Sequence, residues 1–300
     1  MADARSMLLK TLAFHETWKH APTRIEWMMT LDGDASVQRI DVEHEIDALL
    51  REKIVVEHHG RILFPDAAHL MDEIISNELF APRKRRVARR AVSWLARLAG
   101  VRFVALCNTN ALGHANDGSD LDFFIVTRAG TIAQTRALAT LLFKFLGRRP
   151  KAGDERDTVC LSYFVSDDGL DLSSHMLPGD DPYFRYWFLS MVPLFDDGVS
   201  AQLWGANRAI TSHHPFATRW EVSPDLSVAA PSLRVPTIKQ LESIPSRLQA
   251  RAFPASIREL KNRDTRVIVT SKALKFHVTD GREAYRSDYH ATLVRRGLAV

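Results

Sequence analysis

Two aspartates separated by one residue are the clearest chemical feature of this sequence. Asp120 and Asp122 stand at the start of the apolar run Phe123-Phe124-Ile125-Val126, which predicts a strand. Alternate side chains of a strand point to the same face, so both carboxylates would lie together and repel each other unless a cation joins them. Hard oxygen ligands favour Mg²⁺, which usually bridges to substrate phosphates. The pair therefore predicts a catalytic Mg²⁺ site for a triphosphate, although a solvated acidic strand end would have the same pattern.

The segments around this pair predict the elements that position it. Apolar, β-prone runs alternate with an Asn- and Gly-rich segment and with one amphipathic segment. The expected order is a strand (101–106), a loop (108–118), a strand (121–126), a helix (131–145) and a strand (159–165). We therefore expect a small α/β core over residues 81–175.

The first 80 residues have the pattern of a winged helix-turn-helix unit. Helices are expected over 7–14, over 24–29 and from Asp41 onward, followed by two short strands around the turn His59-Gly60. Such a unit binds DNA through its third helix. Between Asp41 and Lys53, however, acidic residues outnumber basic ones, and an acidic helix is repelled by phosphates. A structural or protein-contact role is therefore favoured over DNA binding.

Positive charge is concentrated just after this unit. No acidic residue occurs between Leu79 and Asn116, and a helix is expected from Pro82 to about Ala99. Its basic residues either attract phosphates of nucleotides, nucleic acid or lipids, or simply form a solvated helix face. The basic residues of this segment are Arg83, Lys84, Arg85, Arg86, Arg89, Arg90, Arg97 and Arg102.

The segment SDLDFFIVT, preceded by a strand and a small-residue loop, resembles the nucleotidyltransferase superfamily related to DNA polymerase β. The whole chain is similar to bacterial nucleotidyltransferase-domain proteins with a winged-helix-like N-terminal region. The similar segments include VCLSYFVSDDGLDL, DPYFRYWFLSMVPLFDD and SKALKFHVTDGREAYR. The resemblance implies transfer of a nucleoside monophosphate from an NTP to an acceptor, with Mg²⁺ as cofactor and with Asp120 and Asp122 as its ligands.

The sequence departs from this family at two places. Asn108-Thr109 stands where the family has Gly-Ser, so Asn108, Thr109 and Ser119 are the residues expected to contact phosphates. The strand over 159–165 lacks the third carboxylate that active members use as general base or second metal ligand. Four nearby aspartates could fold back to replace it: Asp157, Asp167, Asp168 and Asp171.

Residues 176–300 are expected to form a mainly helical C-terminal region. Its aromatic residues between Tyr183 and Trp204 have helical spacing and favour packing over substrate binding. Lys275 and Arg282 either reach a phosphate in the core or belong to a surface charge cluster.

Composition limits the remaining possibilities. The 300 residues are 46% hydrophobic, which is typical of a globular protein, and two cysteines exclude a disulfide framework. No secretory signal or membrane span is expected, so a cytoplasmic protein without a membrane partner is predicted. Two alternatives to an enzyme stay open. One is a catalytically silent nucleotidyltransferase fold that binds nucleotides or proteins, and the other is a DNA-binding regulator.

Overall fold

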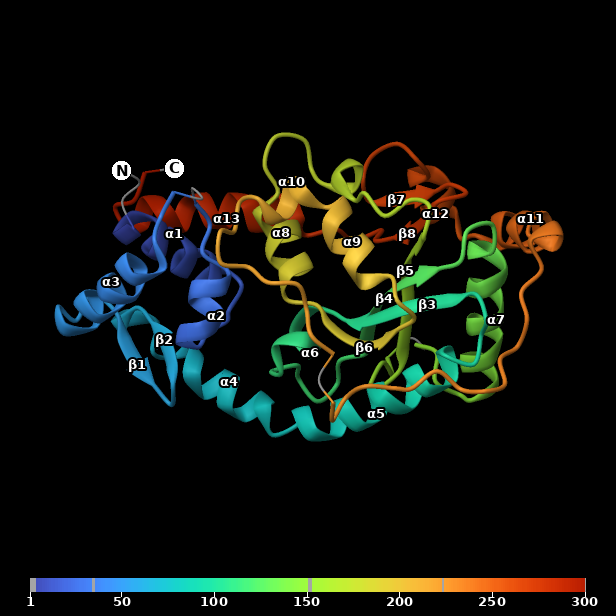
Figure 1. Ribbon diagram of the computed structural model, residues 1–300, viewed down its shortest axis with the longest axis horizontal. Helices are drawn as coiled ribbons and strands as arrows, with labels where there is room; N and C mark the ends of the chain where they lie inside the picture. Colours follow the sequence, from blue (N-terminus) through green and yellow to red (C-terminus); the bar gives the residue numbers. More distant parts are fainter. Residues whose placement is uncertain (1–3, 34–35, 151–152, 223, 300) are drawn as a thin grey trace.

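The structure is a computed structural model that describes residues 4–33, 36–150, 153–222 and 224–299. The protein is a mixed α/β molecule organised around a six-stranded mixed sheet (Figure 1). β4 and β5 run parallel and are connected by the helix α7 (Ile132–Phe145), whereas the other neighbouring strands are antiparallel. Across the sheet the strands follow the order β6 (Val192–Asp196), β3 (Val101–Leu106), β4 (Leu121–Thr127), β5 (Val159–Ser166), β8 (Ala273–Phe276) and β7 (Val267–Val269).

The strands are apolar on both faces because helices cover both faces. In β4, Leu121 and Phe123 join the core beneath α5 (Ala81–Leu95) and α7, while Phe124 joins the opposite core. That second core is closed by α8 (Pro182–Leu189), α9 (Ser200–Ala206) and α10 (Arg208–Thr211), which lie above the strands in Figure 1. Asp122 precedes Phe124 by two residues, so its side chain faces the α8 side of the sheet.

The N-terminal part folds around a core of its own. It consists of α1 (Ala4–Thr17), α2 (Arg24–Met29), α3 (Arg39–Arg51), β1 (Val56–His58), β2 (Arg61–Leu63) and α4 (Leu70–Glu78). A capping box starts α2, because the Thr23 hydroxyl accepts from the Glu26 amide and the Glu26 carboxylate accepts from the Thr23 amide. α3 begins at Arg39, two residues before Asp41, which lies in the first turn and does not cap the helix.

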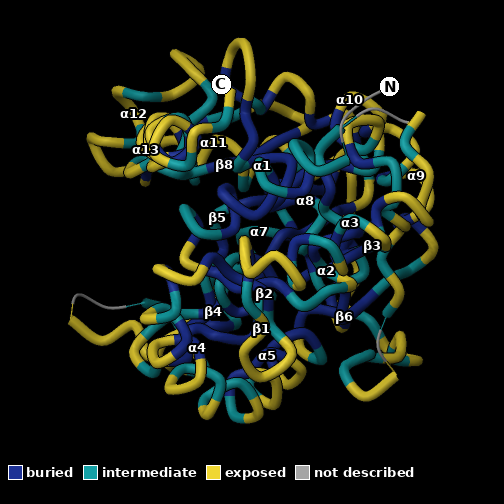
Figure 2. The backbone as a smooth tube through the Cα atoms, turned by 90° about the vertical axis from the view of Figure 1, so that its left-hand side faces the viewer, coloured by how far each residue is buried: buried dark blue, intermediate teal, exposed yellow. Residues whose placement is uncertain are grey.

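The C-terminal helix joins this N-terminal part to the rest of the molecule. α13 (Arg282–Arg295) packs against α1 and contributes Tyr289 and Leu293 to the N-terminal core. The ring of Phe14 in α1 also stacks on Tyr186 of α8, with centroids 3.9 Å apart. Figure 2 shows buried backbone in the interior of the molecule and most of the exposed segments toward its outside.

The three strands of the core segment agree closely with their predicted ranges, but other elements differ. The segment 108–118, predicted as a loop, contains the short helix α6 (Asn108–Leu112). Residues 176–300 carry helices, as expected, yet also supply β6, β7 and β8 to the sheet. The remaining elements are η1 (Pro65–Ala67), η2 (Ser173–His175), η3 (Lys239–Leu241), α11 (Ser243–Ala252) and α12 (Ala255–Leu260). The division of the chain at residues 80 and 175 stays a prediction.

Within the described ranges, no helix has both the length and the apolar character needed to cross a bilayer.

Candidate functional site

A cavity of about 620 Å³ opens on the α8 side of the sheet, where β4 and β5 begin. Its walls come from four parts of the chain: the start of α6, the starts of β4 and β5, the helix α8 and the segment 275–285. Polar lining residues gather on the strand side and aromatic ones on the α8 side. They include Asn108, Asp120, Asp122, Glu155, Cys160, Ser162, Tyr183, Phe184, Trp187, Lys275, His277, Asp280, Arg282 and Tyr285.

Asp120 and Asp122 both line this cavity, as the spacing in the strand predicts. Each offers a carboxylate oxygen that lies within 4.8 Å of the other and of the Cys160 sulfur. The parallel pairing of β4 with β5 explains this meeting, because Asp122 and Cys160 are direct partners in the register. Two carboxylates and one thiol therefore converge on one point.

The side chain of Asn108 fixes one of these carboxylates. Its Nδ2 donates a hydrogen bond of 2.7 Å to Oδ2 of Asp122, and the Tyr183 hydroxyl donates to Asn108 Oδ1 at 3.4 Å. Asn108 has a φ of 56°, a left-handed conformation that asparagine tolerates better than most residues. Nearby, buried Asn110 donates from Nδ2 to the backbone oxygen of Asp120 at 2.8 Å. The helix α6 thus positions both members of the pair.

The negative charge of the aspartate pair is incompletely balanced by its neighbours. Burial, the carboxylate of Asp122 and that of Glu155 raise the pKa of Asp120 to about 6. Burial and the same two aspartates also raise the pKa of the Cys160 thiol. His277 adds no charge, because burial lowers its pKa to about 3; its Nε2 lies 3.3 Å from the Ser162 hydroxyl. A cation placed between the carboxylates would relieve their repulsion and favour their ionised forms.

The other two residues expected to contact phosphates lie outside this arrangement. Neither Thr109 nor Ser119 is among the residues that line the cavity. The Ser119 hydroxyl donates to the backbone oxygen of Asn116 at 3.0 Å, so it holds the turn before β4. Of the three predicted residues, the structure brings only Asn108 to the aspartate pair.

None of the four aspartates considered as a third carboxylate lines the cavity. Asp157 pairs with Arg83 and Lys84, at 2.9 and 3.2 Å, and Asp167 pairs with Arg102 at 2.8 Å. Asp168 accepts from the Ser166 hydroxyl, and Asp171 accepts from the Ser173 amide.

Glu155, which no sequence pattern indicated, is an acidic residue that does line the cavity near the pair. It is exposed, lines the cavity and acts on the pKa of Asp120. The position of Glu155 follows from the topology, because residues just before β5 lie beside residues just before β4 when the two strands are parallel. The Asp157 amide accordingly donates to the Ser119 backbone oxygen at 3.1 Å.

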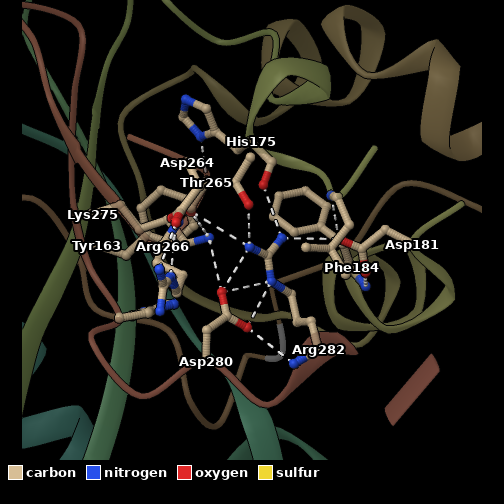
Figure 3. A network of polar contacts seen from close by, with 12 residues as sticks. Tyr163, His175, Asp181, Phe184, Asp264, Thr265, Arg266, Lys275, Asp280 and Arg282 are labelled. Carbon is tan, nitrogen blue, oxygen red and sulfur yellow. Dashed lines mark hydrogen bonds and ion pairs between the residues drawn. The ribbon is translucent and has the colours of Figure 1, made fainter. Parts of the chain in front are cut away.

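The C-terminal segment forms a buried charged wall of the cavity, shown in Figure 3. Lys275 and Arg282 are only 1% and 4% exposed, so the alternative that they belong to a surface charge cluster is wrong. The Arg282 guanidinium donates to Asp280 and to Asp181, both at distances of 2.7–2.9 Å, and to the Thr265 hydroxyl. Lys275 donates to the Thr265 backbone oxygen at 2.7 Å and lies 4.0 Å from Asp280. Burial and the neighbouring Arg282 lower the pKa of Lys275 to about 7.

The basic helix α5 touches the site only through its first turns. Lys84 is 2% exposed and donates to the Ser119 backbone oxygen at 2.5 Å, while Arg83 pairs with Asp117. These contacts fix the loop that leads into Asp120. No residue of α5 is among those that line the cavity.

Comparison of the chain with models of known protein families, with curated proteins and with solved structures finds no match.

Proposed function

We propose that the protein is a Mg²⁺-dependent nucleotidyltransferase, which moves a nucleoside monophosphate from an NTP to an acceptor. The observation that supports this most is the convergence of Asp120 and Asp122 on one point of a cavity large enough for a nucleotide. The resemblance of SDLDFFIVT and its surroundings to the polymerase β-related superfamily points in the same direction. On this proposal the sheet core is of the nucleotidyltransferase type, and the first 80 residues are a winged-helix-like unit.

The residues present fit a magnesium ion. Mg²⁺ accepts one or two carboxylates and keeps the rest of its shell for water and phosphate oxygens, so Asp120 and Asp122 suffice to hold it. When bound, the ion would neutralise phosphate charge and orient the phosphates for in-line attack. The raised pKa of Asp120 also fits, because a site built for a cation contains more negative charge than it can balance alone.

The other side chains of the cavity have separate roles in this proposal. Asn108 holds Asp122 in position through its 2.7 Å hydrogen bond. Tyr183, Phe184 and Trp187 offer aromatic surface on the α8 side. On this proposal the carboxylate of Glu155, which lines the cavity, would accept the proton of the attacking hydroxyl as a general base.

A panel of labelled NTPs tests this proposal. The protein is incubated with Mg²⁺, each NTP and a set of small-molecule, protein and RNA acceptors, and pyrophosphate release is measured. We expect release with one or more acceptors, and its loss in Asp120→Asn. The matched control is Asp225→Asn, since Asp225 is exposed and lies outside the cavity. Release that is equal in Asp120→Asn and the wild type would contradict the proposal.

One observation favours a second candidate, a catalytically silent fold that binds nucleotides. Cys160 stands beside Asp122 on β5, where the resemblance leads one to expect a carboxylate. A thiol with a raised pKa neither holds Mg²⁺ well nor serves as a base at neutral pH. NTP binding without pyrophosphate release under any condition would favour this candidate.

The third possibility, a regulator that reads DNA through α3, has less support. Acidic side chains of α3 are joined in ion pairs within the N-terminal part, as in Arg39–Glu43 at 2.9 Å and Arg24–Asp47 at 2.7 Å. A helix with this charge gains little from the DNA backbone.

A further inference from the structure

The outward face of α5 is covered by arginines. At 100° per residue, Arg86, Arg89, Arg90 and Ser93 fall on one side of the helix, and Arg97 continues that side just beyond its end. The opposite side, with Ala88, Val92 and Leu95, is buried against the sheet. Arg86, Arg89, Arg90 and Arg97, all exposed, are called the arginine strip below.

The charge of the arginine strip is not balanced by neighbouring acids. Within the described ranges, the ion pairs made by α5 involve Arg83 and Lys84, and none involves a member of the strip. The hydrogen bond given by Arg89 goes to an uncharged group, the backbone oxygen of Ser227, at 3.4 Å. Four guanidinium groups therefore face solvent with their charge available to a ligand.

The surface at the strip is also hollowed and carries an aromatic ring. A groove of about 330 Å³ lies between α5 and residues 227–229, and Arg86, Arg89, Arg90 and Ser93 line it. Beside it Trp94 is 41% exposed, and the guanidinium of Arg97 lies 5.0 Å from the centre of its ring. Arginines together with an accessible indole provide both phosphate contacts and a surface for base stacking.

We propose that the arginine strip and Trp94 bind single-stranded nucleic acid. From Arg86 to Arg97 the strip extends about 16 Å, at 1.5 Å per helical residue, which is enough for several consecutive phosphates. Arginine suits this task, because its guanidinium pairs with phosphate in a bidentate way and stacks on aromatic rings. This surface is distinct from α3, the helix through which a winged-helix unit would bind DNA.

An anionic membrane is the main competing ligand, and the packing of α5 argues against it. A helix that lies on a membrane inserts an apolar face between lipids. In α5 that face is already buried against the sheet, which leaves Trp94 as its exposed large apolar side chain within the described helix. Phosphates in a groove, with one ring for stacking, match the surface better than a lipid layer does.

Fluorescence anisotropy with short labelled single-stranded RNA and DNA, the matching duplexes, and vesicles of phosphatidylglycerol tests the proposal on the full chain. The strip variant is Arg86→Ala/Arg89→Ala/Arg90→Ala. Its matched control is Arg247→Ala/Arg251→Ala/Arg258→Ala, which removes three exposed arginines from α11 and α12. Both variants change the net charge equally, so nonspecific attraction falls by the same amount in each.

We expect the strip variant to bind single strands at least about tenfold more weakly than the wild type. The slope of the logarithm of the binding constant against the logarithm of the salt concentration should become shallower by about 2. Each phosphate that is no longer neutralised contributes roughly 0.7. The control should stay within about twofold of the wild type. Trp94→Leu should weaken single-strand binding about fivefold while leaving duplex binding nearly unchanged, because only unpaired bases stack on it.

An equal loss of single-strand affinity in the strip variant and its control would overturn the proposal. Binding of the protein to vesicles without binding to any oligonucleotide would also overturn it. The proposal is independent of nucleotidyl transfer, since Asp120→Asn should bind single strands as the wild type does. Failure of one proposal is thereby distinguishable from failure of the other.

Discussion

The amide of Asn108 donates a hydrogen bond of 2.7 Å to the carboxylate of Asp122, across the junction of α6 and β4. The backbone of Asn108 has to adopt a φ of 56° at this place. One residue thus meets two demands, a left-handed turn after β3 and an amide donor for a partly buried carboxylate. Glycine would meet only the first demand, and alanine would meet neither.

Substitutions at Asn108 separate these two contributions. Asn108→Ala should lower the free energy of unfolding by about 2 kcal/mol, since it removes a charge-assisted hydrogen bond and strains the backbone. Asn108→Gly should cost about 1 kcal/mol less than alanine, because glycine adopts the left-handed conformation freely. Urea unfolding measures both values. Equal losses in the two variants would show that the backbone conformation contributes nothing.

Asp120 should make the metal-free protein less stable as the pH rises. Its pKa in the folded protein is about 6, against an ordinary value of 3.8. The folded state therefore holds its proton more tightly than the unfolded state. The resulting decrease in the free energy of unfolding is absent below about pH 3.8, grows between pH 3.8 and 6, and is complete above pH 6.

Asp120→Asn removes this cost, so it should stabilise the protein by about 1 kcal/mol at pH 7.5, after allowance for partial solvent screening. Near pH 4 the same variant should have little effect. Urea unfolding in the presence of a chelator, with Asp225→Asn as the control, measures the difference. Destabilisation by Asp120→Asn at both pH values would contradict the charge balance described for the site.

Cys160 lies beside the aspartate pair and offers a test of which groups would hold a cation there. On the proposed function, Cys160→Ser should leave the Mg²⁺ affinity within about twofold of the wild type, because the two aspartates would supply the ligands. Cys160→Asp places a third carboxylate beside Asp122 and should raise Mg²⁺ affinity on the order of tenfold, at some expense to metal-free stability. Calorimetric Mg²⁺ titration in the presence of an NTP tests both variants. A large loss of affinity in Cys160→Ser would mean that the thiol itself is a ligand.

Arg282 should be essential for stability although it lies near the end of the chain. It is buried with Asp181 and beside the half-buried Asp280, and Arg282→Met would leave Asp181 without its cation and Asp280 with Lys275 alone, 4.0 Å away. Breaking a buried pair of this kind costs about 3–5 kcal/mol. Arg263→Ala, at an exposed position, should change stability by less than about 0.5 kcal/mol. A similar small effect in both variants, measured by urea unfolding, would contradict a structural role for the charged wall.

Local sequence patterns predicted the elements that carry the aspartate pair. The strand over 101–106 has the predicted bounds, and β4 and β5 each extend one residue beyond theirs. Strand alternation also predicted correctly that Asp120 and Asp122 share a face. These features depend on neighbours within a few residues, which is the range over which periodicity is informative.

The opposite wall of the cavity could not be predicted in this way. Lys275 reaches it because β8 pairs with β5, and the register partner of Lys275 is Tyr163, more than a hundred residues away in the sequence. β6 and β7 have only five and three residues, and β6 includes Pro193, so neither has a clear strand pattern. Glu155 was missed for the related reason that its position follows from the parallel pairing and not from a motif.

The most direct test of the account is the binding of Mn²⁺, a spectroscopic substitute for Mg²⁺, because it requires no knowledge of the acceptor. Electron paramagnetic resonance follows the loss of the free Mn²⁺ signal as protein is added without an NTP, which would itself chelate the ion. The account predicts saturable binding by the wild type and by Asp225→Asn, and loss of that binding in both Asp120→Asn and Asp122→Asn. Binding by these two variants that equals the wild type would contradict the claim that the pair holds a divalent ion.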